Sequence, residues 1–229
     1  MYTFDEGEII IINKPTRWSS FDVVRKIRNT IRFKKIGHAG TLDPLASGIL
    51  ILATGKKTKT ISSLQATTKE YIGTITLGGT TPCFDLELPI DKTYPTEHIT
   101  NELIHATALT FVGEQMQYPP IYSAVKQDGK RLYIAARKNE EVELKKRSVT
   151  ISAFEITKIE MPIVYFRVVC SSGTYVRSLA NDFGKAMNSG SHLSSLCRTK
   201  SGDITISQAT DLEKWVDDFK AWKRNQETS

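Results

Sequence analysis

Apolar residues follow two kinds of spacing along this chain, and the first kind predicts strands. Continuous apolar runs of strand length lie within Glu8–Asn13 and Ile49–Ala53. Polar and apolar residues alternate over Lys69–Leu77, while Val149–Ile159 and Ile163–Cys170 have the composition of two paired strands. Alternation with a period of two places successive side chains on opposite faces of a sheet, so we expect one face of each strand to be buried.

The second kind of spacing predicts a helix after the first strand. Ser19 or Ser20 is placed to cap it, because a hydroxyl side chain there accepts a hydrogen bond from a free backbone N–H. The apolar residues of this helix recur at helical spacing and are expected to face the core: Phe21, Val24, Ile27 and Ile31. Its basic residues are expected on the outside: Arg25, Arg28 and Arg32.

Three further helices are predicted by the same spacing, over Ile99–Phe111, Thr174–Met187 and residues 210–224. The breaker Gly173 directly precedes the second of them. Arg177 lies off the apolar stripe of that helix and near its N-terminus, where the helix dipole disfavours a cation, so we expect it to have an anionic partner. The last helix has an apolar stripe that is expected to dock on the core: Leu212, Trp215, Val216, Phe219 and Trp222.

The composition is that of an ordinary globular protein. The 229 residues are 40% hydrophobic and 24% charged, without a Pro/Gly/Ser-rich linker or an internal repeat. We therefore expect one domain over residues 1–229, of the α+β class. No apolar run approaches the roughly 20 residues of a membrane helix, and the N-terminus is acidic where a signal peptide is basic. Three cysteines without metal-type spacing favour a reduced, cytoplasmic protein, which we expect to be a monomer without membrane contact or bound metal.

The positive charge is concentrated near the N-terminus. Of 31 Lys and Arg and 25 Asp and Glu in the whole chain, residues 1–60 contain 11 basic and 5 acidic side chains, which leaves 20 of each kind for the remainder. The formal excess of +6 therefore lies entirely in the first quarter. A localised positive field suits a polyanion such as a nucleic acid backbone, although a solvated helix face would give the same pattern.

A loop-forming stretch, Gly37–Gly48, contains the candidate chemistry. It has three glycines and a proline in twelve residues, and it presents His38 and Asp43 directly before an apolar strand. Asp43 precedes Pro44, which biases Asp43 out of the α conformation and so restricts the direction of its carboxylate. An Asp-Pro pair also commonly begins a turn, so the pattern by itself leaves both interpretations open.

This loop resembles the catalytic motif of the bacterial TruB family, the tRNA pseudouridine synthases that act on the T-loop uridine at tRNA position 55. Five other segments resemble motifs of the family in the same order, so the resemblance covers residues 8 to 210 approximately. The segments are Asn13–Pro15 with Ser19–Val24, Lys69–Tyr71, Pro119–Lys126 with Gly129–Tyr133, Cys170–Ala180 and Leu196–Gly202.

The resemblance implies the pseudouridine synthase fold, which is a mixed, mostly antiparallel central sheet flanked by helices. It also implies an isomerisation in which the N1–C1′ glycosidic bond breaks, the uracil turns and C5 joins C1′. This reaction needs neither a cofactor nor a metal. The expected partner is the T-arm of tRNA, whose target base lies inside a folded loop and must be extruded before a side chain can reach it.

The resemblance also implies a role for each candidate site residue. Asp43 would be the catalytic carboxylate, and Arg177 would be the ion-pair partner that keeps it charged in a dry pocket. Tyr71 would stack on the uracil and take part in the deprotonation of C5. His38 would stack in the space that the base leaves, and Leu196 would pack beside the pocket. Whether Asp43 acts at C1′, at C6 or on a sugar proton stays open.

Four basic side chains are expected to contact RNA phosphates. Phosphate contacts of this kind position a nucleic acid without reading its sequence. Three of the four lie in residues 119–147, a segment that resembles the mobile RNA-contacting segment of the family. The residues are Lys14, Lys126, Lys130 and Arg131.

The chain departs from the family pattern at several points. Arg17 stands where the opening motif usually has glycine, which removes the easy access of glycine to positive φ. Pro82–Phe84 replaces a polar, acidic-flanked stretch, of which Asp85 retains one acidic position, and Cys197 replaces a common arginine. Many relatives continue into a C-terminal PUA RNA-binding domain, whereas this sequence ends soon after its last predicted helix, so we expect no such domain and a weaker hold on the acceptor end of tRNA.

A second function class uses many of the same features. A tRNA-binding chaperone without essential catalysis would need the basic surface but not the trio Asp43, Tyr71 and Arg177. The substitution Asp43→Asn distinguishes the two, because it changes charge while nearly preserving size. An enzyme would lose isomerisation and keep RNA binding, whereas a chaperone would lose neither.

Overall fold

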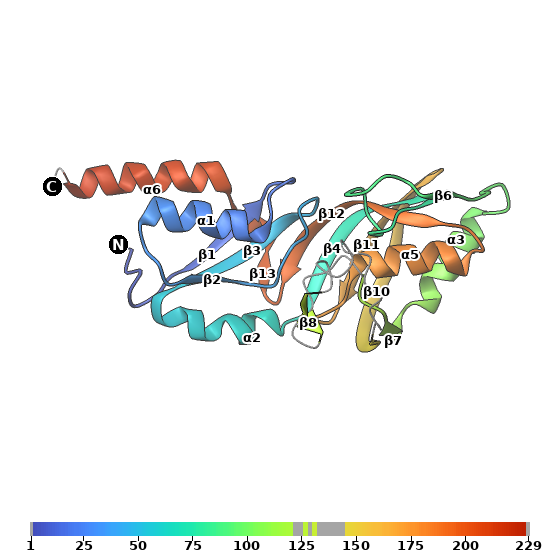
Figure 1. Cartoon of the computed structure of the whole chain (residues 1–229), viewed down its shortest axis with the longest axis horizontal. Coiled ribbons are helices and arrows are strands. Elements are labelled where there is room, and N and C mark those ends of the chain that lie inside the picture. Colours follow the sequence, from blue (N-terminus) through green and yellow to red (C-terminus); the bar gives the residue numbers. More distant parts are fainter. Residues whose placement is uncertain (1, 121–125, 128–129, 132–144, 228–229) are drawn as a thin grey trace. The chain divides into compact units, whose positions relative to one another are not determined.

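The computed structural model describes residues 2–120, 126–127, 130–131 and 145–227. These residues form helices and a mixed, mostly antiparallel sheet, which confirms the predicted α+β class (Figure 1). Within these ranges, no helix is long and apolar enough to cross a membrane.

The chain folds into two compact units, where the sequence suggested one domain. Unit 1 comprises Met1–Tyr71 and Leu196–Ser229, and unit 2 comprises Ile72–Ser195. The division falls inside two strands, β4 (Lys69–Leu77) and β12 (Ser191–Ser201), each of which runs from one unit into the other. No linker composition marks a boundary of this kind, because residues within a strand look like any other strand residues.

Unit 1 contains one part of the sheet, with the strand order β14-β1-β3-β12. β3 pairs antiparallel with both β1 and β2, and β14 and β12 run parallel to β1 and β3 respectively. The connection from β2 to β3 is the loop that contains Asp43. The strands of this part are β1 (Ile9–Lys14), β2 (Ile36–Ala39), β3 (Ser47–Thr54), β13 (Ile204–Thr205) and β14 (Thr210–Asp211).

Two helices cover one face of this sheet, α1 (Ser20–Ile31) and α6 (Leu212–Glu227). Ser19 caps α1 and forms a reciprocal capping box with Asp22. On the opposite face lie η1 (Gly55–Thr60) and α2 (Ile61–Gln65), as the pale blue segment of Figure 1 shows. The apolar core under α1 and α6 combines alternate strand residues with helical stripes: Ile10, Ile12, Val23, Val24, Ile27, Leu50, Leu52, Leu212, Trp215, Val216 and Phe219.

Two sequence predictions for these helices need correction. Phe21 is 58% exposed and does not face the core, because the inward stripe of α1 is centred on Val23, Val24 and Ile27. The C-terminal helix begins at Leu212 rather than at residue 210, since the two preceding residues pair with β1 as strand β14. The docking of its predicted apolar stripe on the core is confirmed.

Unit 2 contains the other part of the sheet, with the strand order β12-β4-β11-β10-β7. Its helices α3 (Asn101–Thr110) and α5 (Val176–Ala186) confirm two of the predicted helices. Four phenylalanines pack edge to face in its core: Phe111, Phe154, Phe166 and Phe183. Its remaining strands are β5 (Gly79–Thr80), β6 (Lys92–Thr93), β7 (Gly113–Gln117), β8 (Lys126–Gln127), β9 (Lys130–Arg131), β10 (Arg147–Glu160) and β11 (Ile163–Cys170).

Candidate active site

Asp43 lies half-buried in a shaped loop of unit 1 between β2 and β3. Its backbone carbonyl accepts the Ala46 N–H at 3.1 Å, which closes a turn around Pro44. Gly48 has a φ of +98°, and a Cβ there would lie 2.4 Å from the carbonyl oxygen of Arg198, so only glycine fits. The glycines of this motif thus allow the loop to pass close to a neighbouring strand.

Lys14 holds the Asp43 loop from the end of β1. It has an exposed fraction of 0%, and its ammonium donates to the carbonyl oxygens of Pro15 at 3.0 Å, of Trp18, and of Pro44 at 3.2 Å. Burial lowers the pKa of Lys14 to about 8, and the nearby negative charge of Asp43 offsets part of this shift. Lys14 is therefore a buried cation that fixes the residue following the candidate carboxylate.

This position does not fit the phosphate contact that the sequence suggested for Lys14. In β1 every second side chain is buried, so Lys14 shares the inward face with Ile10 and Ile12. The sequence does not contain this signal, because Ile9–Ile12 is a continuous apolar run without alternation.

Arg198 is a second buried cation, which holds the loop from β12. Its Nε donates to the Ile49 carbonyl at 2.8 Å and its Nη2 to the Gly40 carbonyl at 3.0 Å. β12 runs parallel to β3 here, with Arg198 opposite Gly48. No separate role was predicted for Arg198, although it lies two residues after Leu196 and hence on the same inward face of its strand.

His38 lies at the start of the loop, on β2, and is half-buried. Burial lowers the pKa of its imidazole below the usual value, the positive charge of Arg198 lowers it further, and the Gly40 backbone offsets part of the shift. The ring is therefore neutral at pH 7. A neutral, flat imidazole is suited to stacking against a base.

Arg17 adopts a φ of +65°, in the left-handed region that glycine favours. Arginine at this position was predicted to lack access to positive φ, and that prediction is wrong. Its backbone N–H donates to the Pro44 carbonyl at 2.7 Å, so the turn is fixed by the same carbonyl that accepts a bond from Lys14. The loop geometry therefore survives the substitution, with some backbone strain at Arg17.

Tyr71 and Leu196 lie at the ends of unit 1, on β4 and β12, and each is 9% exposed. The Leu196 carbonyl accepts the Ser47 hydroxyl at 3.4 Å, which places its backbone beside the exit of the Asp43 loop. Next to Tyr71, the Glu70 carboxylate accepts the Thr199 hydroxyl at 2.8 Å. These bonds fix the start of β4 and the adjacent turn of β12.

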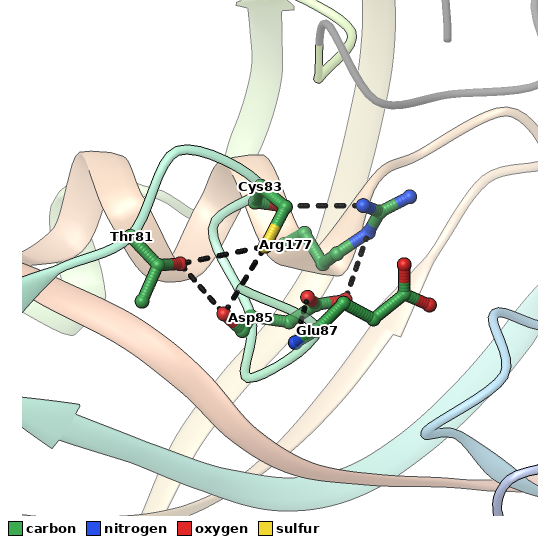
Figure 2. A network of polar contacts seen from close by, with 5 residues as sticks. All are labelled: Thr81, Cys83, Asp85, Glu87 and Arg177. Carbon is green, nitrogen blue, oxygen red and sulfur yellow. Dashed lines mark hydrogen bonds and ion pairs between the residues drawn. The ribbon is translucent and has the colours of Figure 1, made fainter. Parts of the chain in front are cut away.

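Arg177 is held in unit 2 by a network that the sequence did not identify. Its side chain is 4% exposed, and Nε lies 3.6 Å from Oδ2 of Asp85, whose side chain is also 4% exposed (Figure 2). Its Nη1 donates to the Cys83 carbonyl at 3.2 Å. Asp85 thus provides an anionic partner for the arginine near the start of α5, as the position on the helix required.

The loop that carries Asp85 is itself fixed by side-chain hydrogen bonds (Figure 2). The Asp85 carbonyl accepts the Thr81 hydroxyl at 2.6 Å and the Cys83 thiol at 3.3 Å. The Asp85 carboxylate accepts the Glu87 N–H at 3.0 Å, and Phe84 has a φ of +66°. Burial raises the pKa of the Cys83 thiol, so this group stays protonated and donates.

The described residues therefore form two preorganised groups. In unit 1 the loop with His38 and Asp43 is held by Lys14 and Arg198, with Leu196 beside its exit. In unit 2 Arg177 is held by Asp85. The remaining basic candidates are Lys126, Lys130 and Arg131, whose backbones pair as strands β8 and β9. Much of the segment that was predicted to be mobile, residues 119–147, lies outside the described residues.

Comparison with known families bears on this loop directly. Residues 28–176 match the family described as TruB family pseudouridylate synthase (N terminal domain). The chain belongs to the TruB family. The match includes the whole Asp43 loop and Asp85, whereas Lys14, Leu196 and Arg198 lie outside it and Arg177 directly follows its last residue.

Relatives cover nearly the full length of the chain. A protein of Flavobacterium johnsoniae named tRNA pseudouridine synthase B is 56% identical over 214 residues, which are 90% of this chain and 93% of that protein. One of the same name from Phocaeicola vulgatus is 51% identical over 223 residues, covering 93% of this chain and 95% of the other.

Solved structures show the same fold at lower identity. A Cbf5-Nop10-Gar1 complex matches with a TM-score of 0.76 and 30% identity, over 97% of this chain and 57% of that chain. An H/ACA RNP bound to a substrate RNA containing 2′-deoxyuridine matches with a TM-score of 0.74 and 28% identity, over 97% and 56%. This TruB-family chain therefore spans little more than half the length of those solved chains and has the pseudouridine synthase fold.

Proposed function

We propose that this chain isomerises the T-loop uridine at position 55 of tRNA to pseudouridine. Membership of the TruB family and the relatives named tRNA pseudouridine synthase B support this proposal. The observation that carries it is the anchoring of the Asp43 loop by two buried cations, Lys14 and Arg198. A loop backbone held this firmly suits a reaction that depends on the exact placement of the carboxylate it carries.

The chemistry is an internal transfer. The N1–C1′ bond breaks, the uracil turns, the C5–C1′ bond forms, and the proton lost from C5 is balanced by one gained at N1. We assign Asp43 to the sugar–base linkage, where it must be ionised. The charge of Lys14 attracts the Asp43 carboxylate and so favours its charged form. Arg177 is proposed as its ion-pair partner, a role that rests on the family motif.

The other site residues are assigned to contacts with the extruded nucleotide and with the RNA backbone. His38, as a neutral ring, would stack in the space left by the extruded base, and Tyr71 would stack on the uracil and assist loss of the C5 proton. Leu196 would pack beside the base. Phosphate contacts are proposed for three residues of the segment between β7 and β10: Lys126, Lys130 and Arg131.

The substitution Asp43→Asn tests the proposal. We expect tRNA labelled with tritium at uridine C5 to release no tritium with this variant, while its dissociation constant for tRNA stays within about threefold, roughly 0.7 kcal/mol. Asp203→Asn, at an exposed turn residue of unit 1, is the matched control and should release tritium like the wild type. Release by Asp43→Asn at the wild-type rate would overturn the proposal and favour the tRNA chaperone.

A further inference from the structure

A groove in unit 1 lies between α1 and α6 and has a volume of about 420 Å³. Its floor is apolar, formed by the buried Val216 and Phe219. Its walls are polar and basic, and no carboxylate lines it: the wall residues are Lys26, Asn29, Thr30, Arg32, Lys220 and Lys223. Four cations around one concavity point to an anionic ligand larger than a single ion.

The cations of the groove are available to such a ligand. Arg32 is exposed and has no ion pair within the described part of the chain. Lys220 lies 3.9 Å from Asp217 and Lys223 lies 3.7 Å from Glu227, both on the outside of α6. Exposed pairs of this kind contribute at most about 1 kcal/mol, so either amine can turn toward an anion. Lys26, on α1, lies 3.4 Å from the carboxylate of Glu213 on α6.

The groove is connected to the Asp43 loop through α1. The Ser20 hydroxyl accepts the Leu42 N–H at 2.9 Å, so the first residue of α1 abuts the loop. Lys26 and Arg32 follow six and twelve residues later, which at about 1.5 Å per residue is roughly 9 to 18 Å along the helix. Arg25 and Arg28 also lie on α1, where Arg25 is paired with Asp22 at 2.6 Å, so the charge between the loop and the groove is mixed in sign.

We propose that this groove, lined by α1 and α6, binds the sugar–phosphate backbone of the RNA substrate away from the nucleotide that reacts. The proposal rests on the proposed function for the identity of the RNA. A polyphosphate backbone fits better than an acidic peptide because the cations stand on both walls and the apolar surface is confined to the buried floor.

Direct binding measurements test the groove. The variants Arg32→Gln, at the residue directly after α1, and Lys220→Gln/Lys223→Gln, on α6, remove one and two cations respectively. Dissociation constants for unmodified tRNA are measured by filter binding between 50 and 300 mM KCl. Each lost phosphate contact should lower the slope of log affinity against log salt by about 0.7 to 0.9. The double variant should bind about tenfold or more weakly at 0.1 M salt.

Lys214→Gln is the matched control, because Lys214 is also exposed on α6 and paired with an aspartate, Asp218 at 2.9 Å, but lies outside the groove. It should bind tRNA like the wild type. Unchanged affinity and slope in both groove variants, or an equal loss in Lys214→Gln, would overturn the proposal. Binding needs no turnover, so a wild type that binds tRNA but forms no pseudouridine defeats only the proposed function.

Discussion

Lys14 and Pro44 are joined by a hydrogen bond of 3.2 Å from the buried ammonium to the backbone carbonyl directly after Asp43. The same carbonyl accepts the Arg17 N–H at 2.7 Å. One oxygen therefore connects the end of β1, the following turn and the loop with the candidate carboxylate. This junction fixes the backbone directly after Asp43.

The depressed pKa of Lys14 predicts a pH dependence of stability. The native pKa is about 8 and the unfolded value is 10.5, so between these values the unfolded chain binds a proton that the native protein has lost. Stability therefore rises with pH in this window, by up to about 1.4 kcal/mol per pH unit. We expect the free energy of unfolding of the wild type, relative to Lys14→Met, to increase by roughly 2 kcal/mol between pH 7 and 9.5.

Urea denaturation of both proteins at each pH measures this difference. Groups common to both proteins cancel, because the comparison retains only the contribution of Lys14. A difference that stays flat or falls over this range would show that the ammonium has its ordinary pKa and is not buried among carbonyls. Lys220→Met, at an exposed lysine of α6, is the control for the removal of a lysine that is not buried.

The pair formed by Asp85 and Arg177 predicts a loss of catalysis without a loss of RNA binding. Asp85→Asn retains the hydrogen bond from the Glu87 N–H but removes the charge facing the guanidinium. Breaking a buried pair costs about 3 to 5 kcal/mol. We expect part of this free energy to be lost as transition-state stabilisation, so kcat for pseudouridine formation should fall about 10- to 100-fold, with little change in KM.

Asp91→Asn is a control in the same loop region, since Asp91 is exposed and its carboxylate accepts the Thr80 hydroxyl at 2.7 Å. It should leave kcat unchanged. Equal kcat in Asp85→Asn and the wild type would show that Asp85 does not act through Arg177. A rise in KM alone would assign Asp85 to RNA binding instead.

Thr81 predicts a smaller effect of the same kind. Its buried hydroxyl donates to the Asp85 carbonyl at 2.6 Å, so Thr81→Val leaves this oxygen with only the weaker Cys83 thiol at 3.3 Å. The variant should lose about 1 to 2 kcal/mol of stability in urea denaturation and several-fold in kcat. Thr81→Ser keeps the donor and should recover most of kcat. Equal kcat for the Val and Ser variants would rule out orientation of Asp85 by the hydroxyl.

The sequence predicted local features well and long-range polar contacts poorly. The helices α3 and α5 and the pair β10–β11 follow from apolar spacing, which depends only on near neighbours. The partnership of Arg177 with Asp85 joins residues far apart in the chain, and no periodicity encodes it. Phe21 was misplaced because helical spacing defines a stripe but not its exact edges.

The burial of two cations was the second feature that was not predicted from the sequence. Lys14 and Arg198 are charged residue types that usually lie at the surface, so composition favoured an RNA contact for the first and assigned nothing to the second. For Arg198 the alternation of β12 contains the missing signal, since Arg198 lies two residues after the buried Leu196. For Lys14 it does not, because Ile9–Ile12 is apolar at every position and the sequence leaves the direction of the lysine open.

Arg17 predicts a gain in stability on substitution by glycine. A non-glycine residue in the left-handed region costs about 1 kcal/mol or more, whereas glycine adopts it freely but loses more backbone entropy on folding. We expect Arg17→Gly to raise the free energy of unfolding by about 0.5 to 1 kcal/mol. Arg25→Gly, in the middle of α1, should instead lower it by about 1 kcal/mol. Destabilisation by both substitutions would mean that the Arg17 side chain contributes more to the loop than its backbone strain removes.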